Sequence, residues 1–208
     1  PVSDLPQLYN PESGWLFSAN STPFRITDPA YDNQRDDYSK TMGIEPRMTN
    51  RAMMALELFV PDEAISEDEL LRYRANGQYH PNSPLRKRLA EIFARADEAD
   101  GEVAEAIAIL HEWDGATNVE NRGTALAVLT GMKVGGYEII DDKMDVMQAL
   151  EQTIAELENV YGRIDPPWGD VNRIRRGDVD MALSGGPDTL RAIYGFREKF
   201  EENNGLVA

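Results

Sequence analysis

The sequence predicts a mainly α-helical protein with a few short strands. Apolar residues recur at helical spacing through the middle of the chain, and residues that cap helix ends stand beside most of these stretches. The flanking segments are rich in proline, glycine and small polar residues, a composition typical of loops. We therefore expect an irregular segment with short strands at 1–44, a helical body at 45–162 and a loop-rich segment at 163–208.

The N-terminal segment contains two short apolar patches in an otherwise polar sequence. They are Trp15-Leu16-Phe17 and Phe24-Arg25-Ile26. Runs of this length, bounded by turn-forming residues, predict one or two short strands.

The helical body begins with two capped segments. Thr49 is a cap for a first helix that runs through Leu58. Ser66 and Glu69 have the spacing of a capping box, in which each side chain accepts a hydrogen bond from the backbone of the other residue. Gly77 suits the end of this second helix.

Four further helices are expected in the same body. Ser83-Pro84 places a cap before a proline at the first helical position. Trp113 closes the apolar stripe of its helix, so we expect its side chain to be buried. The four helices are expected at 85–93, 103–113, 124–132 and 141–161, the last ending at Gly162.

The helical pattern is interrupted after residue 162. Pro166-Pro167-Trp168-Gly169 predicts a rigid turn, and residues 171–174 predict a short strand. Ser184-Gly185-Gly186-Pro187 predicts a loop, and a last helix is expected from Pro187 to Phe200.

The charge balance excludes several partners. The formal net charge is −16, from 21 basic and 37 acidic residues. Nucleic acids and anionic membrane surfaces both attract basic proteins, so we expect neither as a partner. There are no cysteines, which rules out disulfides and thiolate chemistry. No apolar run approaches the roughly 20 residues that cross a bilayer.

Common catalytic motifs are missing from this sequence. Its two histidines, His80 and His111, lack the spacing of a zinc-protease helix and have no evident place in a Ser-His-Asp triad. We expect surface or capping roles for both. The glycine pairs at 135–136 and 185–186 lack the Lys-Ser/Thr of a phosphate-binding loop.

Asn20 is the residue whose position suggests chemistry. It ends the first apolar patch, ahead of Pro23, where a side-chain amide can point into a cleft and donate to an oxyanion. Two other interpretations are open. The residue can form an ordinary Asx turn, and Asn20-Ser21-Thr22 is also a glycosylation sequon.

Three stretches resemble the penicillin acylase family. Residues 10–24 resemble the Asn-Pro-x-Ser-Gly…Asn-x-x-Pro stretch of the catalytic β-chain, and their Asn-Ser-Thr-Pro-Phe spelling is closer to the lactone and aculeacin acylase branch. Residues 110–115 are similar to the family's Leu-x-x-Trp-Asp-Gly, and residues 168–192 to its Trp-Gly-x-Val-x-Arg…Gly-Gly-x-Asp-Thr pattern. The order and rough spacing match across nearly the whole chain.

The resemblance implies the helical portion of an N-terminal-nucleophile hydrolase with an αββα core. In that family a precursor cleaves itself, and the exposed serine attacks an amide with its own α-amino group as base. Asn20 matches the family asparagine that helps to bind the oxyanion, and Arg47 matches an arginine that orients the nucleophile region and the substrate. Asp32, after a one-residue shift in the alignment, matches an aspartate that binds calcium in the penicillin branch.

The resemblance also implies the localisation, substrate, cofactor and partners of the protein. We expect a periplasmic or secreted enzyme that acts on a small acylated amine, such as an acyl-homoserine lactone or a penicillin. No cofactor is expected apart from a structural calcium ion, and the partners are the α-chain and the remainder of the β-chain.

The two ends of the sequence depart from the family's pattern. Pro1 cannot be the serine nucleophile, and Gly205-Leu206-Val207-Ala208 precede the family's last strands. We therefore expect an internal fragment that is inactive alone. The alternative interpretation is a non-catalytic acidic helical interaction module.

Overall fold

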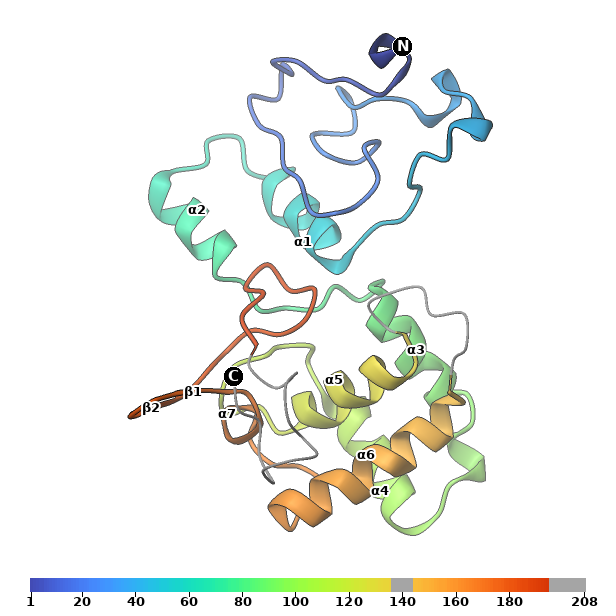
Figure 1. Ribbon diagram of the computed structural model, residues 1–208, viewed down its shortest axis with the longest axis vertical. Helices are drawn as coiled ribbons and strands as arrows, with labels where there is room; N and C mark the ends of the chain where they lie inside the picture. The colour runs from blue at the N-terminus through green and yellow to red at the C-terminus, as the bar shows by residue number, and fades with distance from the viewer. Residues whose placement is uncertain (136–143, 195–208) are drawn as a thin grey trace. The chain divides into compact units, whose positions relative to one another are not determined.

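The computed structural model describes residues 1–135 and 144–194, and its contacts group the chain into two compact units, 1–74 and 75–208 (Figure 1). Within the described residues there are seven α-helices and one two-stranded antiparallel sheet, which confirms the mainly helical prediction. No helix among them is long and apolar enough to span a bilayer. The division of the sequence at residues 44 and 162 stays a prediction.

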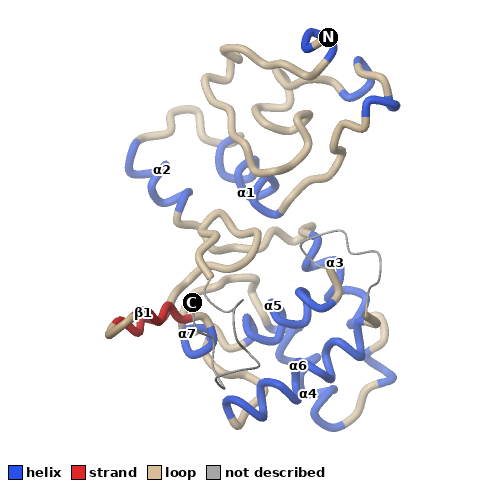
Figure 2. The backbone as a smooth tube through the Cα atoms, in the orientation of Figure 1, coloured by secondary structure: helices blue, strands red, loops and turns tan. Residues whose placement is uncertain are grey.

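The first unit is mostly loop and has two helices at its C-terminal end (Figure 2). Helix α1 covers Asn50–Phe59 and α2 covers Glu67–Arg74. The hydroxyl of Thr49 caps α1, and the side chains of Ser66 and Glu69 accept from each other's backbone N–H ahead of α2. Both predicted helix starts are therefore confirmed.

Aromatic contacts connect the loops of this unit to its helices. The ring of Phe59 lies 5.5 Å from that of Trp15 and 6.4 Å from that of Phe17, measured between centroids. Tyr73 on α2 lies 5.7 Å from the same Phe59 ring. The end of α1 is thus the point at which the first loop and α2 meet.

The one or two short strands expected in the first unit are not found among its described residues. One backbone hydrogen bond, from the N–H of Phe17 to the carbonyl of Ile26 at 2.9 Å, joins the two patches. The carboxylate of Asp32 accepts from the N–H groups of Ile26 and Thr27. The prediction was wrong because a side chain satisfies the backbone donors that a partner strand would otherwise bind.

The second unit is a helical bundle in which α5 is central. Nine consecutive residues of α5, from Gly123 to Gly131, are buried, and the helix packs against α3, α4 and α6. A helix that is apolar on all sides belongs inside a core. The bounds of these helices are α3 Pro84–Phe93, α4 Gly101–Glu112, α5 Gly123–Lys133 and α6 Val146–Tyr161.

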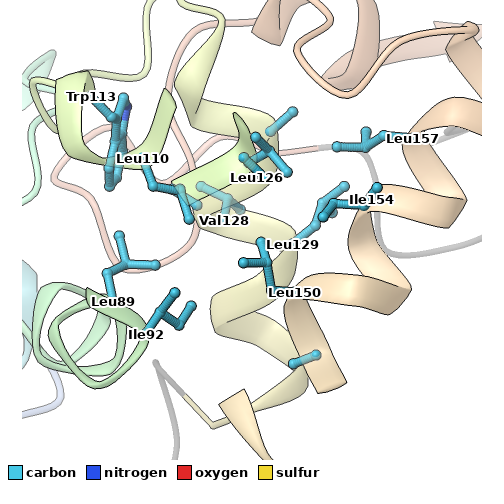
Figure 3. Packing of buried hydrophobic residues seen from close by; sticks show 14 of the residues in the cluster. Leu89, Ile92, Leu110, Trp113, Leu126, Val128, Leu129, Leu150, Ile154 and Leu157 are labelled. Atoms are coloured by element: carbon cyan, nitrogen blue, oxygen red, sulfur yellow. The ribbon is translucent and has the colours of Figure 1, made fainter. Parts of the chain in front are cut away.

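Leucines from these helices meet in the core (Figure 3). Leu110, Leu126, Leu150 and Leu157 have no exposed surface. Burying one such side chain contributes about 1.5–3 kcal/mol, so their packing is a large part of the stability of this unit.

The expected burial of Trp113 is confirmed. Its side chain is 4% exposed, and its indole Nε1–H donates to the carbonyl of Ala116 and to the hydroxyl of Thr124. The longest predicted helix begins later than expected, because Asp145 caps α6 at Val146 through the N–H groups of the first turn. Residues 141–143, where we placed its start, lie outside the described residues.

The C-terminal part differs from the sequence prediction in three places. The predicted rigid turn contains a short helix, and the strand expected at 171–174 begins two residues later, because Asn172 N–H still donates to the carbonyl of Trp168 as the end of this helix. The last helix is not formed over 187–194, where Thr189 closes a turn on Gly186. Residues 195–200 lie outside the described residues. The elements here are α7 Trp168–Val171, β1 Arg173–Arg176 and β2 Val179–Ala182.

Candidate functional site

Asn20 lies in a loop that is held against the start of α1. Thr49 donates from its hydroxyl to the carbonyl of Ala19 at 3.0 Å, while the same oxygen accepts the capping bond of the helix. On the other side of Asn20, the N–H of Thr22 donates to the carbonyl of Arg47 at 2.8 Å. Two hydrogen bonds therefore flank Asn20 and fix its backbone.

The side chain of Asn20 is oriented by an arginine. Arg51, in the first turn of α1, donates from Nη2 to Asn20 Oδ1 at 3.0 Å. A guanidinium has only donors, so the oxygen of the carboxamide must face it and the NH₂ group must face away. Asn20 is exposed, and none of the hydrogen bonds among the described residues uses its Nδ2. The arrangement leaves an amide donor free in solvent.

The backbone of Asn20 explains why asparagine suits this position. Its φ is +52°, in the left-handed region that asparagine tolerates better than most residues. The side chain does not form an Asx turn, since its oxygen is bound by Arg51 and the N–H of Thr22 is bound by Arg47. The geometry therefore contradicts the Asx-turn interpretation, and the oxyanion donor and the glycosylation sequon stay predictions.

The surroundings of Asn20 favour negative charge. The N-terminus of α1 carries a partial positive charge, and the guanidinium of Arg51 in its first turn is bound to Asn20. The backbone of Arg47 binds the loop, as described above, and its Nε is buried with no hydrogen-bond partner in the described part of the chain. The orienting role expected of Arg47 stays a prediction.

Arg51 is the residue that the sequence analysis missed. One signal could have pointed to it, because a basic side chain in the first turn opposes the helix dipole and is disfavoured there. Such a residue needs a reason, and its bond to Asn20 supplies one.

Asp32, the third candidate, is buried and already engaged. Its Oδ2 accepts from Ile26 N–H at 2.8 Å and Thr27 N–H at 3.3 Å, and its Oδ1 accepts from Asn33 N–H at 3.0 Å. Calcium takes about 6–8 oxygen ligands, often from several carboxylates. Among the described residues no group of three or more acidic or histidine side chains could hold a metal ion. The described residues do not fit a calcium site by themselves, and the calcium expectation stays a prediction.

The two histidines lie apart from these candidates. His111 is exposed and stacks on the ring of Phe93, with centroids 3.9 Å apart. His80 Nδ1 accepts from the N–H of Asn82 at 3.0 Å and so closes a turn. Both have the surface or capping roles that were expected.

The motif at 110–115 is architectural. Trp113 follows the last residue of α4, and Gly115 has a φ of +87° that a side chain would strain. A Cβ at Gly115 would also lie 3.1 Å from the carbonyl of Tyr79, whose N–H donates to the Gly115 carbonyl. Glycine is needed here for a close approach of two backbones.

The motif at 168–192 has a similar role. Trp168 is fully buried and donates from Nε1 to the carbonyl of Gly185 at 2.8 Å. Asn172 donates from Nδ2 to the carbonyls of Leu183 and Gly185. A Cβ at Gly185 would lie 2.2 Å from the carbonyl of Arg191, so no other residue fits.

One loop connects the two motifs in space. The N–H groups of Trp168 and Gly169 donate to the carbonyls of Asn121 and Val119, and Asn121 Nδ2 donates to the carboxylate of Asp114. The two motifs therefore maintain the second unit, and the candidates for chemistry lie in the first.

A family model described as penicillin amidase matches residues 1–206. The chain belongs to the penicillin amidase family. The family resemblance drawn from the three motifs is confirmed, and membership of this family implies a hydrolase. The closer likeness to the lactone and aculeacin acylase branch stays a prediction. The geometry around Asn20 can be interpreted in that light.

Proposed function

We propose that this chain supplies the oxyanion-binding side chain of an acylase that hydrolyses the amide bond of N-acylated amines. The observation that carries the proposal is the bond from Arg51 to Asn20 Oδ1, which leaves the Asn20 Nδ2–H as an oriented donor. One hydrogen bond from the Thr49 hydroxyl and one between backbone groups fix the loop, so the donor is held before any substrate arrives. A preorganised donor of this kind stabilises charge that develops during acyl transfer.

The proposed reaction proceeds by nucleophilic attack. A serine at the N-terminus of the catalytic chain adds through its oxygen to the amide carbonyl, and its own α-amino group takes the hydroxyl proton. The carbonyl oxygen becomes an oxyanion and accepts from Asn20 Nδ2. Collapse of the intermediate breaks the C–N bond, the amine leaves with the proton, and water then releases the acyl group as a carboxylic acid. We place the nucleophilic serine outside this chain.

The finer features belong to the same proposal. The fold of the catalytic core is that of an N-terminal-nucleophile hydrolase, matured by self-cleavage, and the enzyme is periplasmic or secreted. The α-chain and the remainder of the β-chain are its partners. The Asn20-Ser21-Thr22-Pro23-Phe24 segment favours the lactone and aculeacin acylases over the penicillin branch, with an acyl-homoserine lactone, a penicillin or a related amide as substrate.

Substitution of Asn20 in the self-cleaved enzyme tests the proposal. Asn20→Ala should lower kcat about 10²–10³-fold with a small effect on KM, because the donor acts mainly in the transition state. Asn20→Asp should be no better, since a carboxylate repels the oxyanion. Processing is checked on a gel before kinetics are measured.

Asn20→Gly distinguishes the role of the side-chain amide from the role of the backbone conformation. Glycine adopts a φ of +52° without strain, so this variant keeps the loop and loses only the amide. The proposal requires Asn20→Gly to be as inactive as Asn20→Ala. Asn10, which has a φ of +44° in the same segment, provides the control, and Asn10→Gly should keep its kcat. If processed Asn20→Gly retains most of its kcat, Asn20 is a structural residue and the non-catalytic module becomes the better interpretation of this unit.

A further inference from the structure

A hollow in the first unit carries an unusual charge. It has a volume of about 320 Å³ and is partly open to solvent. Phe24, Pro46 and Met48 give it apolar walls, while Arg25, Arg35 and Asp36 contribute the charged groups. Two cations and one anion meet there, in a chain whose formal net charge is −16. The net charge of the hollow is therefore positive, whereas that of the chain is negative.

The two arginines of the hollow have no carboxylate partner in the described part of the chain. Arg25 is exposed and makes no hydrogen bond or ion pair there. Arg35 donates from Nη1 to the carbonyl of Tyr38 at 2.9 Å, and its guanidinium lies 5.5 Å from the centre of the Phe24 ring. Several other arginines do pair with acids, as Arg88 does with Glu91 and Arg95 with Asp145.

The contact of Arg35 with Phe24 restricts the guanidinium without neutralising it. Stacking on a ring and one bond to a backbone carbonyl leave other N–H donors of the same guanidinium available. A planar fork of donors beside an apolar wall matches a carboxylate that is attached to an apolar body.

We propose that this hollow binds a small organic monocarboxylate. The two guanidinium groups bind the carboxylate, and Phe24 with Met48 contacts the apolar body. Asp36 repels a second negative charge, which favours a monoanion over a dianion such as phosphate. A volume of about 320 Å³ is at the lower end for small-molecule pockets and suits a ligand of this size.

The proposal goes beyond the proposed hydrolysis and does not depend on it. Amide hydrolysis releases a carboxylic acid, so ligands of this class would be present near such an enzyme. Binding can nevertheless be measured on this chain without any reaction, and Asn20 is not among the residues of the hollow.

Calorimetric titration of the chain 1–208 with benzoate tests the proposal. We expect saturable binding in the millimolar range or tighter, weakened by added salt because the contact is electrostatic. Benzamide, which keeps the ring and loses the charge, should bind at least about tenfold more weakly. Inorganic phosphate at neutral pH should also bind more weakly than benzoate. Equal binding of benzamide, or tighter binding of phosphate, overturns the assignment of a monocarboxylate site.

Matched arginine variants locate the binding. Arg25→Gln and Arg35→Gln should each weaken benzoate binding at least about fivefold, and Arg74→Gln, an exposed arginine of the same unit outside the hollow, should not change it. Arg25 makes no contact on which folding depends, so Arg25→Gln stays informative if Arg35→Gln lowers the stability. An equal loss in Arg74→Gln, or no loss in Arg25→Gln, means that benzoate binds elsewhere.

Discussion

Arg51 donates to Asn20 Oδ1 at 3.0 Å, across 31 positions of sequence. This bond connects the first turn of α1 to a loop whose backbone is already held by Thr49 and Arg47. These two hydrogen bonds set the place of Asn20, and the arginine sets which end of the amide faces outward. In the proposed function, Arg51 is therefore a positioning residue that acts through Asn20.

Arg51→Ala should reduce kcat of the self-cleaved enzyme about tenfold with little change in KM. Without the guanidinium the amide rotates, and its donor spends less time in the productive orientation. Arg51→Lys should recover part of the activity, because an ammonium still donates to the oxygen but lacks the planar fork. Steady-state kinetics on the three proteins, with melting temperatures measured alongside, give the comparison.

A double-mutant cycle distinguishes positioning from general damage. If Arg51 acts through Asn20, Arg51→Ala should cost little in the Asn20→Ala background. Arg72→Ala on α2, which removes an exposed arginine of the same unit, is the control and should be neutral. Additive losses from Arg51 and Asn20 would show that the arginine acts on something other than this amide.

The chain 1–208 alone should not hydrolyse acylated amines. On the proposed function it holds an oxyanion donor, while the serine and its amine base reside on a residue that we place outside this chain. Purified chain is assayed for release of free amine against a mock preparation. Turnover proportional to the protein, and absent from the mock, would contradict the assignment of the nucleophile.

Trp113→Ala should destabilise the protein by roughly 3–5 kcal/mol, the usual cost of truncating a buried aromatic residue. Trp113 is 4% exposed, and the guanidinium of Arg86 lies 4.6 Å from the centre of its ring. Trp113→Phe should cost less, because it keeps most of the apolar body while losing the bonds to Ala116 and Thr124. Urea unfolding of the three proteins measures the difference, and equal losses in both variants would show that the indole N–H, not the ring, is what matters.

The helices could be predicted from the sequence because their signals are local. Periodic apolar residues and caps such as Thr49 and Ser66 lie within a few positions of the helix that they specify. The strands of the first unit were predicted wrongly because the side chain of Asp32, which lies outside both apolar patches, binds the backbone N–H of Ile26. Over 187–194 the predicted last helix is not formed, and there a distant partner binds the backbone: the N–H of Arg191 donates to the carbonyl of Asn76.

The candidate site also contains one residue that could be predicted from a local sequence motif and one that could not. Asn20 could be found because the short motif around it is continuous in sequence. Arg51 could not be paired with it, since the link between a loop and a helix start depends on how Thr49 and Arg47 bring the two together. The hollow beside Arg25 and Arg35 is assembled from three separate segments, and no local pattern indicates it.

Tyr161→Phe should leave the protein as stable as the wild type or more stable at neutral pH, and should protect it in alkali. The Tyr161 hydroxyl is buried without a hydrogen-bond partner among the described residues. Removing it therefore breaks no hydrogen bond and removes the cost of burying an unpaired polar group. Desolvation raises the pKa of Tyr161 from 10.0 to about 12, which means that the folded protein favours the protonated form. The stability that depends on protonated Tyr161 is complete below the unfolded pKa and is lost as the pH rises from about 10 to about 12, because the unfolded chain ionises first.

Urea unfolding at about pH 7 and about pH 11 measures this effect. Between these two pH values Tyr161→Phe should lose less unfolding free energy than the wild type. Tyr31→Phe, at an exposed tyrosine, should lose as much stability as the wild type, and an equal alkaline loss in Tyr161→Phe would show that other groups govern this pH range.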